Sequence, residues 1–164
     1  RRTNKDSESE MDKKTYSFEY LRYRAEERLP EADAELAARA AEACRTATYA
    51  PYSHFRVGAA ARLEDGEILS AGNQESEVFP SGMCAERSLL YYVQSNRPGK
   101  RIRALAIASD PSVRECTPCG ACRQVIADTE KRQGAPIRIL MCGPQSTTVA
   151  PSAAALLPFM FELK

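Results

Sequence analysis

The stretch Met83-Cys84-Ala85-Glu86-Arg87 is followed further along the chain by Pro118-Cys119-Gly120-Ala121-Cys122-Arg123. The first stretch offers one thiol with a carboxylate two residues later, and the second offers two thiols one helical turn apart. Three thiolates can hold Zn²⁺ at three corners of a tetrahedron and leave the fourth corner for water, as catalytic zinc sites do. We therefore predict a hydrolytic zinc site in which the three cysteines are ligands and Glu86 carries protons to and from the bound water.

The local sequence around these cysteines suits thiolate ligands. Cys84 and Cys119 fall near the starts of predicted helices, where free backbone N–H groups and the positive end of the helix dipole lower the pKa of a thiol. The spacing between Cys119 and Cys122 places both sulfurs on one helical face. Arg87 and Arg123 lie close to these ligands in sequence, where a guanidinium can donate to the sulfurs and withdraw negative charge. The alternative for both arginines is a solvated position on a helix.

Three other interpretations of the cysteines remain open at this point. The run that begins at Cys116 resembles one type of iron–sulfur motif, but that motif continues to a fourth Cys followed by Pro, which is missing here. A closed structural zinc site could use Cys116 as its fourth ligand, and it would leave Glu86 without a function. Plain buried cysteines are the third alternative, and this is the one that we assign to Cys44 and Cys142.

Size, composition and charge restrict the class of protein. At 164 residues, with 43% hydrophobic residues, the chain is expected to form one domain with a packed core. Its 23 basic and 22 acidic side chains leave a net charge of +1, which provides no long-range field to gather nucleic acid or an anionic membrane. We therefore expect a small, weakly charged substrate, and neither nucleic acid nor a membrane as a partner.

The sequence also bears on the cellular compartment. It contains no apolar run of about 18 residues and no apolar segment near its start, so we expect neither a membrane span nor an export signal. The six cysteines would permit disulfides in a secreted protein, but three of them are clustered, which favours metal binding. A cytoplasmic location follows from this interpretation.

Hydrophobic periodicity predicts an α/β fold. Residues 1–14 are nearly all polar and are expected to form a disordered tail, whereas 15–164 are expected to form a single catalytic domain. The predicted elements are a strand over Tyr16–Tyr20, a helix from Pro30, strands over 55–63 and 67–74, a helix over 83–95, a strand over 101–109, a helix over 119–132, a strand over 137–142, a short edge strand over 147–150 and a final helical turn over 151–157. This order predicts a three-layer α-β-α sandwich around a mixed sheet of about five strands.

The paired cysteine motifs also resemble a known family. Residues 84–87 together with 118–124 resemble the zinc signature of cytidine deaminases, in which a Glu that is not a ligand carries protons. Tyr49–Ala60 resembles the first strand of that family with its preceding loop, and Gly72–Glu75 resembles the end of its nucleoside-binding strand. A Cys in the first ligand position, where other members have His, favours the enzymes that act on free nucleosides. The Leu-Leu-Pro ending extends the likeness toward the C-terminus, and residues 1–30 lie outside it.

The resemblance implies a function and a set of site residues. It implies zinc-dependent hydrolytic deamination of cytidine and deoxycytidine in pyrimidine salvage, with one Zn²⁺ per subunit. The short chain resembles the type that assembles as a homotetramer with shared active sites. The implied residues are Glu86 for catalysis, Cys84, Cys119 and Cys122 for the metal, Asn73, Glu75, Phe55 and Ala85 for the substrate, and Phe79 and Phe161 to close the pocket of a neighbouring subunit.

Each of these assignments has a plainer alternative. Asn73 and Glu75 would also suit a polar hairpin end, Phe55 would suit a core position, and Phe161 would suit an apolar tail packed on its own subunit. His54 is the only histidine, and we interpret it as incidental because three sulfurs already account for the metal.

Two differences from the family pattern bear on the ribose side of the site and on the contact with a neighbouring subunit, and two alternative functions are kept beside the main one. Ser76 stands where the family often has Asn, and Phe79 stands where it often has Tyr. A deaminase of a cytosine-nucleoside antibiotic of the blasticidin S type is one alternative. A non-catalytic structural zinc or nucleic-acid-binding module is the other.

Overall fold

The computed structural model describes residues 11–163 and contains one mixed six-stranded sheet. The strands are β1 (Leu21–Arg24), β2 (Arg56–Leu63), β3 (Ile68–Gly72), β4 (Ile102–Asp110), β5 (Arg138–Cys142) and β6 (Ser146–Ala150). Their order across the sheet is β1-β6-β5-β4-β2-β3, and β4–β5 is the one parallel pair among them. The helices are α1 (Glu31–Thr46), α2 (Ala85–Asn96) and α3 (Gly120–Gln133), with short 3₁₀ turns η1 (Phe79–Ser81) and η2 (Ala154–Leu156).

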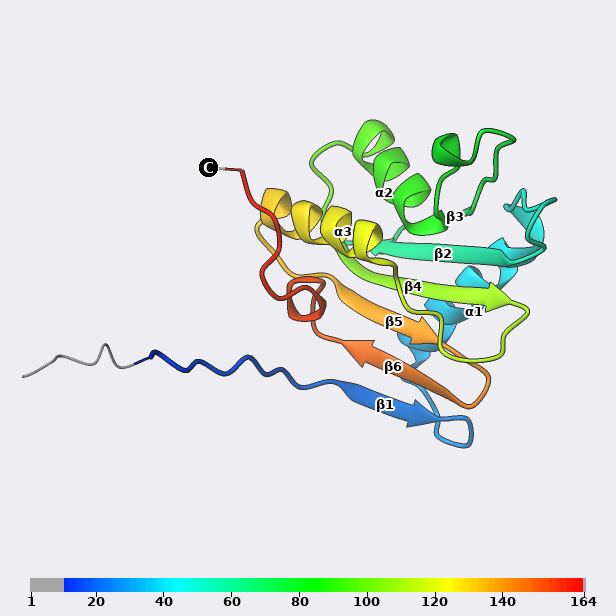
Figure 1. The fold of residues 1–164 in the computed structure, drawn as a ribbon. Coiled ribbons are helices and arrows are strands. Elements are labelled where there is room, and N and C mark those ends of the chain that lie inside the picture. Colours follow the sequence, from blue (N-terminus) through cyan, green and yellow to red (C-terminus); the bar gives the residue numbers. More distant parts are fainter. Residues whose placement is uncertain (1–10, 164) are drawn as a thin grey trace, which may run out of the picture.

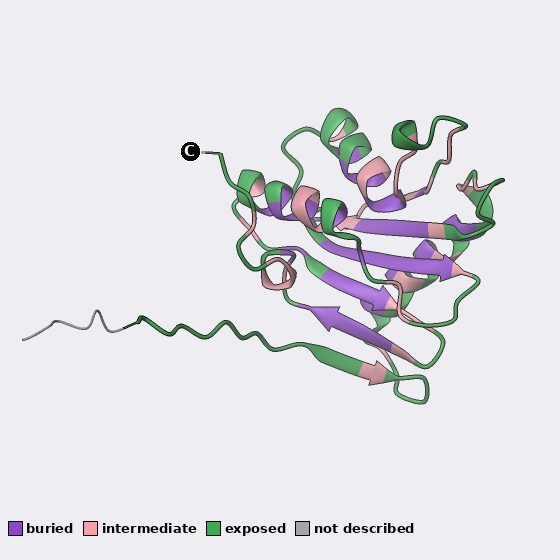
Figure 2. Ribbon diagram, viewed as in Figure 1, coloured by how far each residue is buried: buried purple, intermediate pink, exposed green. Residues whose placement is uncertain are grey.

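The helices cover both faces of the sheet, which confirms the predicted three-layer sandwich. Figure 1 shows α2 and α3 on one face and α1 on the other. Side chains alternate along the central strand β4, so that Leu105 and Ile107 join the core under α2 and α3, whereas Ala104, Ala106 and Ala108 join the core under α1. The central strands are buried on both sides (Figure 2). This packing holds α2 and α3 side by side, with their first turns at the same end of the layer.

Small residues on the sheet allow α1 to approach closely. Gly58 in β2 lies beneath α1, where an added Cβ would stand 2.1 Å from the Ala40 carbonyl oxygen and 2.6 Å from the Cys44 backbone nitrogen. Both atoms belong to the backbone of α1, which cannot rotate away as a side chain would. The fold therefore requires glycine at this position.

Replacing Gly58 with Ala is expected to lower the free energy of unfolding by about 1–3 kcal/mol, because α1 must move away from the sheet. Urea unfolding of the variant and the original protein measures the difference. Gly120→Ala is the matched control, since nothing lies within 4 Å of a Cβ built there. An equal loss of stability in both variants would contradict the close-packing argument.

Two predicted strand assignments are wrong. The strand predicted over Tyr16–Tyr20 begins instead at Leu21, because β6 provides partners only from Ser146 to Val149 for β1, and the chain turns away at Pro151. The three aromatic residues at 16, 18 and 20 contact one another in an extended segment without a partner strand. The predicted edge strand over 147–150 is internal, because β1 pairs with its outer side. The sheet has six strands where about five were expected, because the segment over 147–150 is a full member of it.

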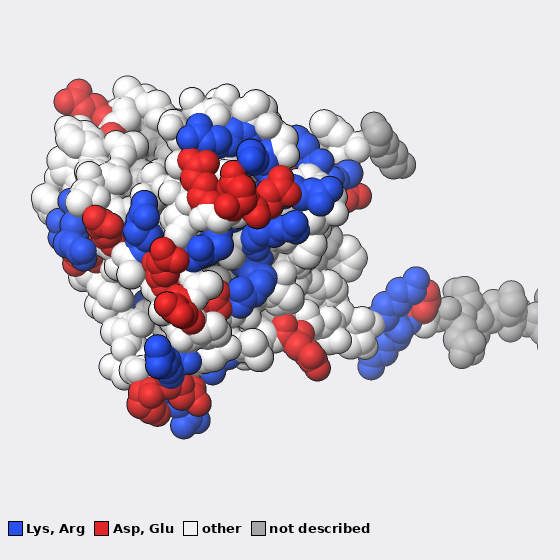
Figure 3. All heavy atoms as spheres, turned by 180° about the vertical axis from the view of Figure 1, so that it is seen from behind, with Lys and Arg blue, Asp and Glu red and all other residues white. Residues whose placement is uncertain are grey.

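The face of the molecule that carries α1 has charged side chains of both signs. Figure 3 shows Lys and Arg side chains interspersed with Asp and Glu over the face that carries α1. Among residues 11–163, no helix has the length and apolar character needed to cross a membrane. Most of the predicted disordered tail, residues 1–10, lies outside the described residues, and 11–14 are exposed without secondary structure.

Candidate metal centre and substrate pocket

Three cysteine sulfurs meet where α2 and α3 begin. Cys84 is the N-cap of α2, Cys119 is the N-cap of α3, and Cys122 lies in the first turn of α3. Their sulfur atoms all lie within 4.8 Å of one another. In a tetrahedral zinc site with Zn–S bonds of about 2.3 Å, the sulfurs stand about 3.8 Å apart, so a small contraction of this group accommodates the ion.

The electrostatics of the three sulfurs favour a bound cation. The pKa of Cys84 is lowered to about 5, first by a hydrogen bond with the Cys122 thiol and then by the guanidinium of Arg87. The pKa of Cys122 is raised, because its thiol shares that hydrogen bond and is buried. One sulfur is thus held as a thiolate beside two more soft donors, which is the donor set that Zn²⁺ prefers.

The two arginines beside the motifs have different contacts. Arg87 Nη2 donates to the Cys84 sulfur at 3.4 Å, and the Arg87 Nε is buried without a hydrogen-bond partner among residues 11–163. Arg123 instead donates to the carbonyl oxygens of Pro118 and Leu156, at 2.8 and 3.1 Å. The expectation that Arg123 donates to the sulfurs therefore differs from the structure, in which Arg123 ties the loop before α3 to the C-terminal segment.

Glu86 lies beside the sulfurs on the first turn of α2. Glu86 is 4% exposed, and the Cys84 and Cys122 sulfurs are close enough to affect the pKa of its carboxyl. Burial raises the pKa of this carboxyl, and the neighbouring Cys84 charge adds to the rise. Among the described residues, the group of sulfurs contains no fourth metal-binding side chain. A buried carboxylate therefore adjoins a three-sulfur site that has room for one more ligand.

A short backbone bridge brings the end of β3 to this site. The Gln74 N–H donates to the Met83 carbonyl at 2.9 Å, and the Met83 N–H donates to the Gln74 carbonyl at 2.8 Å. Because Met83 directly precedes Cys84, this pairing places Gln74, which lies between Asn73 and Glu75 in the chain, beside the segment that carries the first sulfur. The chain segments that the sequence assigned to metal and to sugar are thus neighbours in space.

The predicted sugar-binding residues hold the loop that precedes β2. Asn73 Oδ1 accepts the Val57 N–H at 2.8 Å, and Asn73 Nδ2 donates to the Phe55 carbonyl at 3.0 Å. The Glu75 carboxylate accepts hydrogen bonds from the Tyr52 N–H, at 2.9 Å, and from Ser53. These hydrogen bonds lower the pKa of Glu75, with the Ser53 hydroxyl as the largest cause.

The remaining predicted site residues differ in how far they are exposed to solvent. Ala85 is fully buried at the start of α2. Phe55 is exposed as well, at 41%, and Phe79 and Phe161 are 75% and 70% exposed. Phe79 contacts Tyr52 with ring centroids 6.1 Å apart, and the backbone of Phe161 is held by the Gln124 side chain. Phe79 and Phe161 therefore do not line a closed pocket within this chain.

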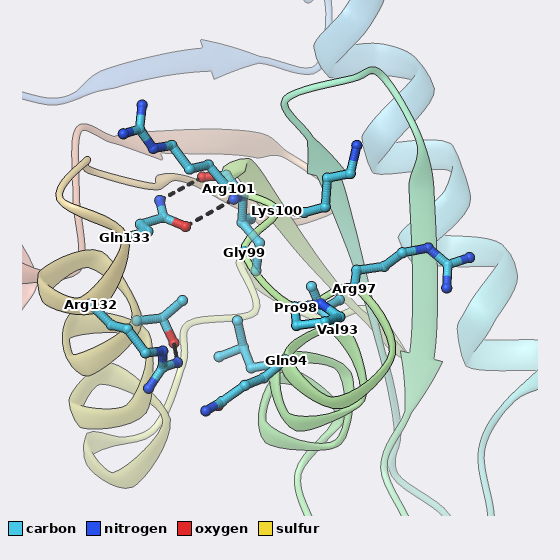
Figure 4. A pocket seen from close by; sticks show the side chains of 12 residues that line it. Val93, Gln94, Arg97, Pro98, Gly99, Lys100, Arg101, Arg132 and Gln133 are labelled. Atoms are coloured by element: carbon cyan, nitrogen blue, oxygen red, sulfur yellow. Dashed lines mark hydrogen bonds between the residues drawn. The ribbon is translucent and has the colours of Figure 1, made fainter.

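A separate cavity of about 500 Å³ lies at the opposite ends of α2 and α3 (Figure 4). It is lined in part by Arg97, Lys100, Arg101 and Arg132. Arg97 is already paired with Glu67, and Lys100 with Asp65, at 2.8 and 2.9 Å. The twelve residues of α2 span about 18 Å, so this cavity is remote from the sulfurs at the helix starts.

Two features of the site escaped the sequence-based predictions. Ser53 contacts Glu75, and His54 has a left-handed backbone with φ of 55°. Both residues belong to the stretch Tyr49–Ala60, which the family resemblance includes, but spacing alone does not show which side chains contact one another. From the sequence alone His54 is interpreted as incidental. In the structure its left-handed backbone conformation distinguishes it.

Comparisons with known proteins agree with this geometry. Residues 30–133 match the family model described as "Cytidine and deoxycytidylate deaminase zinc-binding region". A cytidine deaminase from Halalkalibacterium halodurans is 38% identical over 97 residues, which span 58% of this chain and 71% of that protein. A probable cytidine deaminase from Dictyostelium discoideum is 33% identical over 124 residues, which span 75% of this chain and 80% of that protein.

Solved structures agree as well. The crystal structure of cytidine deaminase from Burkholderia pseudomallei superposes with a TM-score of 0.68 and 33% identity, and it covers 78% of this chain and 98% of its own. A blasticidin-S deaminase from Bacillus cereus is 35% identical over 78 residues, which span only 44% of this chain and 56% of that protein.

Proposed function

The chain belongs to the cytidine and deoxycytidylate deaminase family, and we propose that its site deaminates cytidine and deoxycytidine to uridine and deoxyuridine by hydrolysis, with release of ammonia. The observation that carries this proposal is the group of three sulfurs within 4.8 Å of one another, beside a buried carboxylate. Three protein ligands leave the open position that a hydrolytic site needs, and the carboxylate supplies a group that can carry a proton.

Zinc is the proposed cofactor, one ion per chain, with Cys84, Cys119 and Cys122 as its ligands. A zinc ion held in this way lowers the pKa of a bound water from 15.7 toward about 7. Three thiolates would leave the site with excess negative charge, and Arg87 offsets part of it through its hydrogen bond to the Cys84 sulfur. The reducing cytosol is the proposed compartment, because clustered thiols must remain unoxidised to bind metal.

Glu86 is the proposed proton carrier. Its buried carboxylate would accept a proton from the attacking water and deliver it to N3 of the pyrimidine ring as C4 is attacked. It would then take the second proton from the new hydroxyl on C4 and give it to the amino group, which leaves as ammonia. Burial suits this work, because a raised carboxyl pKa makes the group a better base and keeps its proton available. The backbone of Ala85, between Cys84 and Glu86, is proposed to lie against the base.

Asn73, Glu75 and Phe55 are proposed to hold the nucleoside. The bridge between Gln74 and Met83 supports this proposal, since it places the end of β3 beside the metal group. Phe55 would provide an aromatic wall for the base, and Asn73 with Glu75 would bind the hydroxyls of the sugar. A small neutral nucleoside, as used in pyrimidine salvage, matches the near-zero net charge.

A homotetramer with shared sites is the proposed assembly. The exposed rings of Phe79 and Phe161 support it, because apolar side chains of this size gain most free energy when a neighbouring subunit covers them. Analytical ultracentrifugation measures the assembly directly. A monomer that is fully active would exclude a neighbour's contribution to the pocket.

Metal analysis combined with an absorbance assay tests the proposed function. We expect about one zinc per chain. We also expect the ultraviolet absorbance of added cytidine to fall with time as it is deaminated. Prolonged chelation should remove both the zinc and the activity, and added Zn²⁺ should restore both. Turnover of blasticidin S without turnover of cytidine would replace the proposed substrate, and full activity in metal-free protein would refute the mechanism.

A further inference from the structure

The Ser53 hydroxyl connects two parts of the proposed nucleoside pocket. It donates a hydrogen bond to Glu75 Oε1, and its oxygen accepts the Phe55 N–H at 3.1 Å. The hydroxyl thereby uses both its single proton and a lone pair. One small side chain thus links the carboxylate on the sugar side to the backbone of the aromatic residue on the base side.

The Glu75 carboxylate is held in one orientation by this loop. Besides the Ser53 hydroxyl, the N–H groups of Tyr52 and Ser53 point at its two oxygens, at 2.9 and 3.3 Å. A carboxylate has about four lone-pair positions, so most of them are occupied by the protein. The loop therefore determines which lone pair of the Glu75 carboxylate remains free to accept a hydrogen bond from a sugar hydroxyl.

The backbone around Ser53 shows that this arrangement is enforced. His54 has φ of 55°, a left-handed conformation that residues other than Gly rarely adopt. Such conformations cost free energy and persist only where the surrounding contacts determine them. Here the His54 N–H donates to the Ala50 carbonyl at 3.1 Å, and the Ser53 hydroxyl donates to the Glu75 carboxylate and accepts the Phe55 N–H.

The same turn determines the position of Phe55. Its N–H is held by Ser53, and its carbonyl accepts Asn73 Nδ2 at 3.0 Å. Both polar backbone groups of Phe55 are therefore bonded to side chains of the proposed pocket. Removing the Ser53 hydroxyl would release one of these two bonds and would also remove one of the hydrogen bonds that hold the Glu75 carboxylate.

We propose that Ser53 is a positioning residue, which fixes Glu75 relative to Phe55 so that sugar and base are held together. This inference rests on the proposed function, because it takes the ligand of Glu75 and Phe55 to be a nucleoside. The hydrogen bonds of Ser53 are made with Glu75 and Phe55 and not with the sulfurs or Glu86, so Ser53 acts on substrate binding and leaves proton transfer unchanged.

Steady-state kinetics of Ser53→Ala and Ser53→Thr with cytidine test the proposal. We expect Ser53→Ala to raise KM by about 3–10-fold, the size of one lost hydrogen bond, with kcat within about 2-fold. Ser53→Thr retains a hydroxyl and should restore KM to near the original value. A purely structural role would lower kcat, zinc content and thermal midpoint together, and the hydroxyl of Thr would not selectively restore KM.

Ser146→Ala is the matched control, because Ser146 Oγ donates to the Glu115 carboxylate at 2.7 Å in β6, away from the sulfurs. It should leave KM unchanged. An unchanged KM in Ser53→Ala, an unrescued Ser53→Thr, or an equal rise in Ser146→Ala would overturn the inference while the proposed function stands. Absence of turnover in the original protein would overturn the proposed function, and the inference with it.

Discussion

Replacing Glu86 with Gln is expected to lower kcat for cytidine by at least about 10²–10⁴-fold, the usual contribution of a positioned proton carrier. The amide has nearly the same size and shape as the carboxylate, so it fits the buried position on the first turn of α2. It cannot accept and release a proton in the same way. Chemistry is therefore expected to fail while the pocket stays intact.

The measurement combines kcat with zinc content and with binding of a nucleoside that is not consumed. We expect about one zinc per chain in Glu86→Gln, because the three sulfurs are untouched. Nucleoside binding should also persist, since Phe55, Asn73 and Glu75 belong to other segments. Glu42→Gln on the exposed side of α1 is the control, and it should keep full activity.

Two results would contradict the assignment of Glu86. Turnover near that of the original protein would show that another group carries the proton. Loss of zinc together with activity would show that Glu86 supports the metal site, and the fall in kcat would then say nothing about proton transfer. The assignment therefore depends on a fall in kcat at constant zinc content.

The helices and the central strands could be predicted from the sequence because their signals are local. A nearly continuous apolar run marks β4 as a buried strand, and the apolar face from Leu89 to Val93 marks α2. Cys84 and Cys119 were expected near helix starts, and both are N-caps in the structure. Because the geometry of a helix is regular, the spacing of residues along it directly determines which side chains lie on the same face.

The position of β1 could not be predicted because strand pairing is not local. Tyr16, Phe18 and Tyr20 alternate as a strand would, yet β6 ends before they could pair with it. The residues that do pair, Leu21–Arg24, continue the same alternation of apolar and polar side chains, so the alternation does not show where pairing begins. Their partner lies more than a hundred residues away, and nothing in the segment itself identifies it.

Contacts within the site were also beyond the sequence. Arg87 and Arg123 occupy similar places beside the two motifs, but only Arg87 donates to a sulfur. The Arg123 guanidinium does not donate to a sulfur, because it donates instead to the backbone carbonyl groups of Pro118 and Leu156. The Ser53–Glu75 contact depends in the same way on a turn whose left-handed residue, His54, has no sequence signal.

Replacing Cys122 with Ser is expected to remove zinc and reduce deamination to background. Cys122 is fully buried, whereas Cys84 is half-buried and Cys119 is exposed, so Cys122 is the sulfur that solvent can least replace. A hydroxyl is a far weaker ligand than a thiolate for Zn²⁺, and two remaining sulfurs cannot retain the ion. Because metal binding stabilises only the folded state, the thermal midpoint should fall to that of the chelated original protein.

Two other cysteines make this prediction specific. Cys44→Ser keeps a donor for the Ala40 and Ala108 carbonyl groups on the far side of the sheet, and it should retain zinc and activity. Cys116 lies outside the group of sulfurs, and burial raises its pKa to about 12, which disfavours the thiolate that a ligand requires. Cys116→Ser should therefore also retain zinc. If it instead lost the ion as Cys122→Ser does, the site would be a closed four-sulfur centre, and a hydrolytic function would lose its open position.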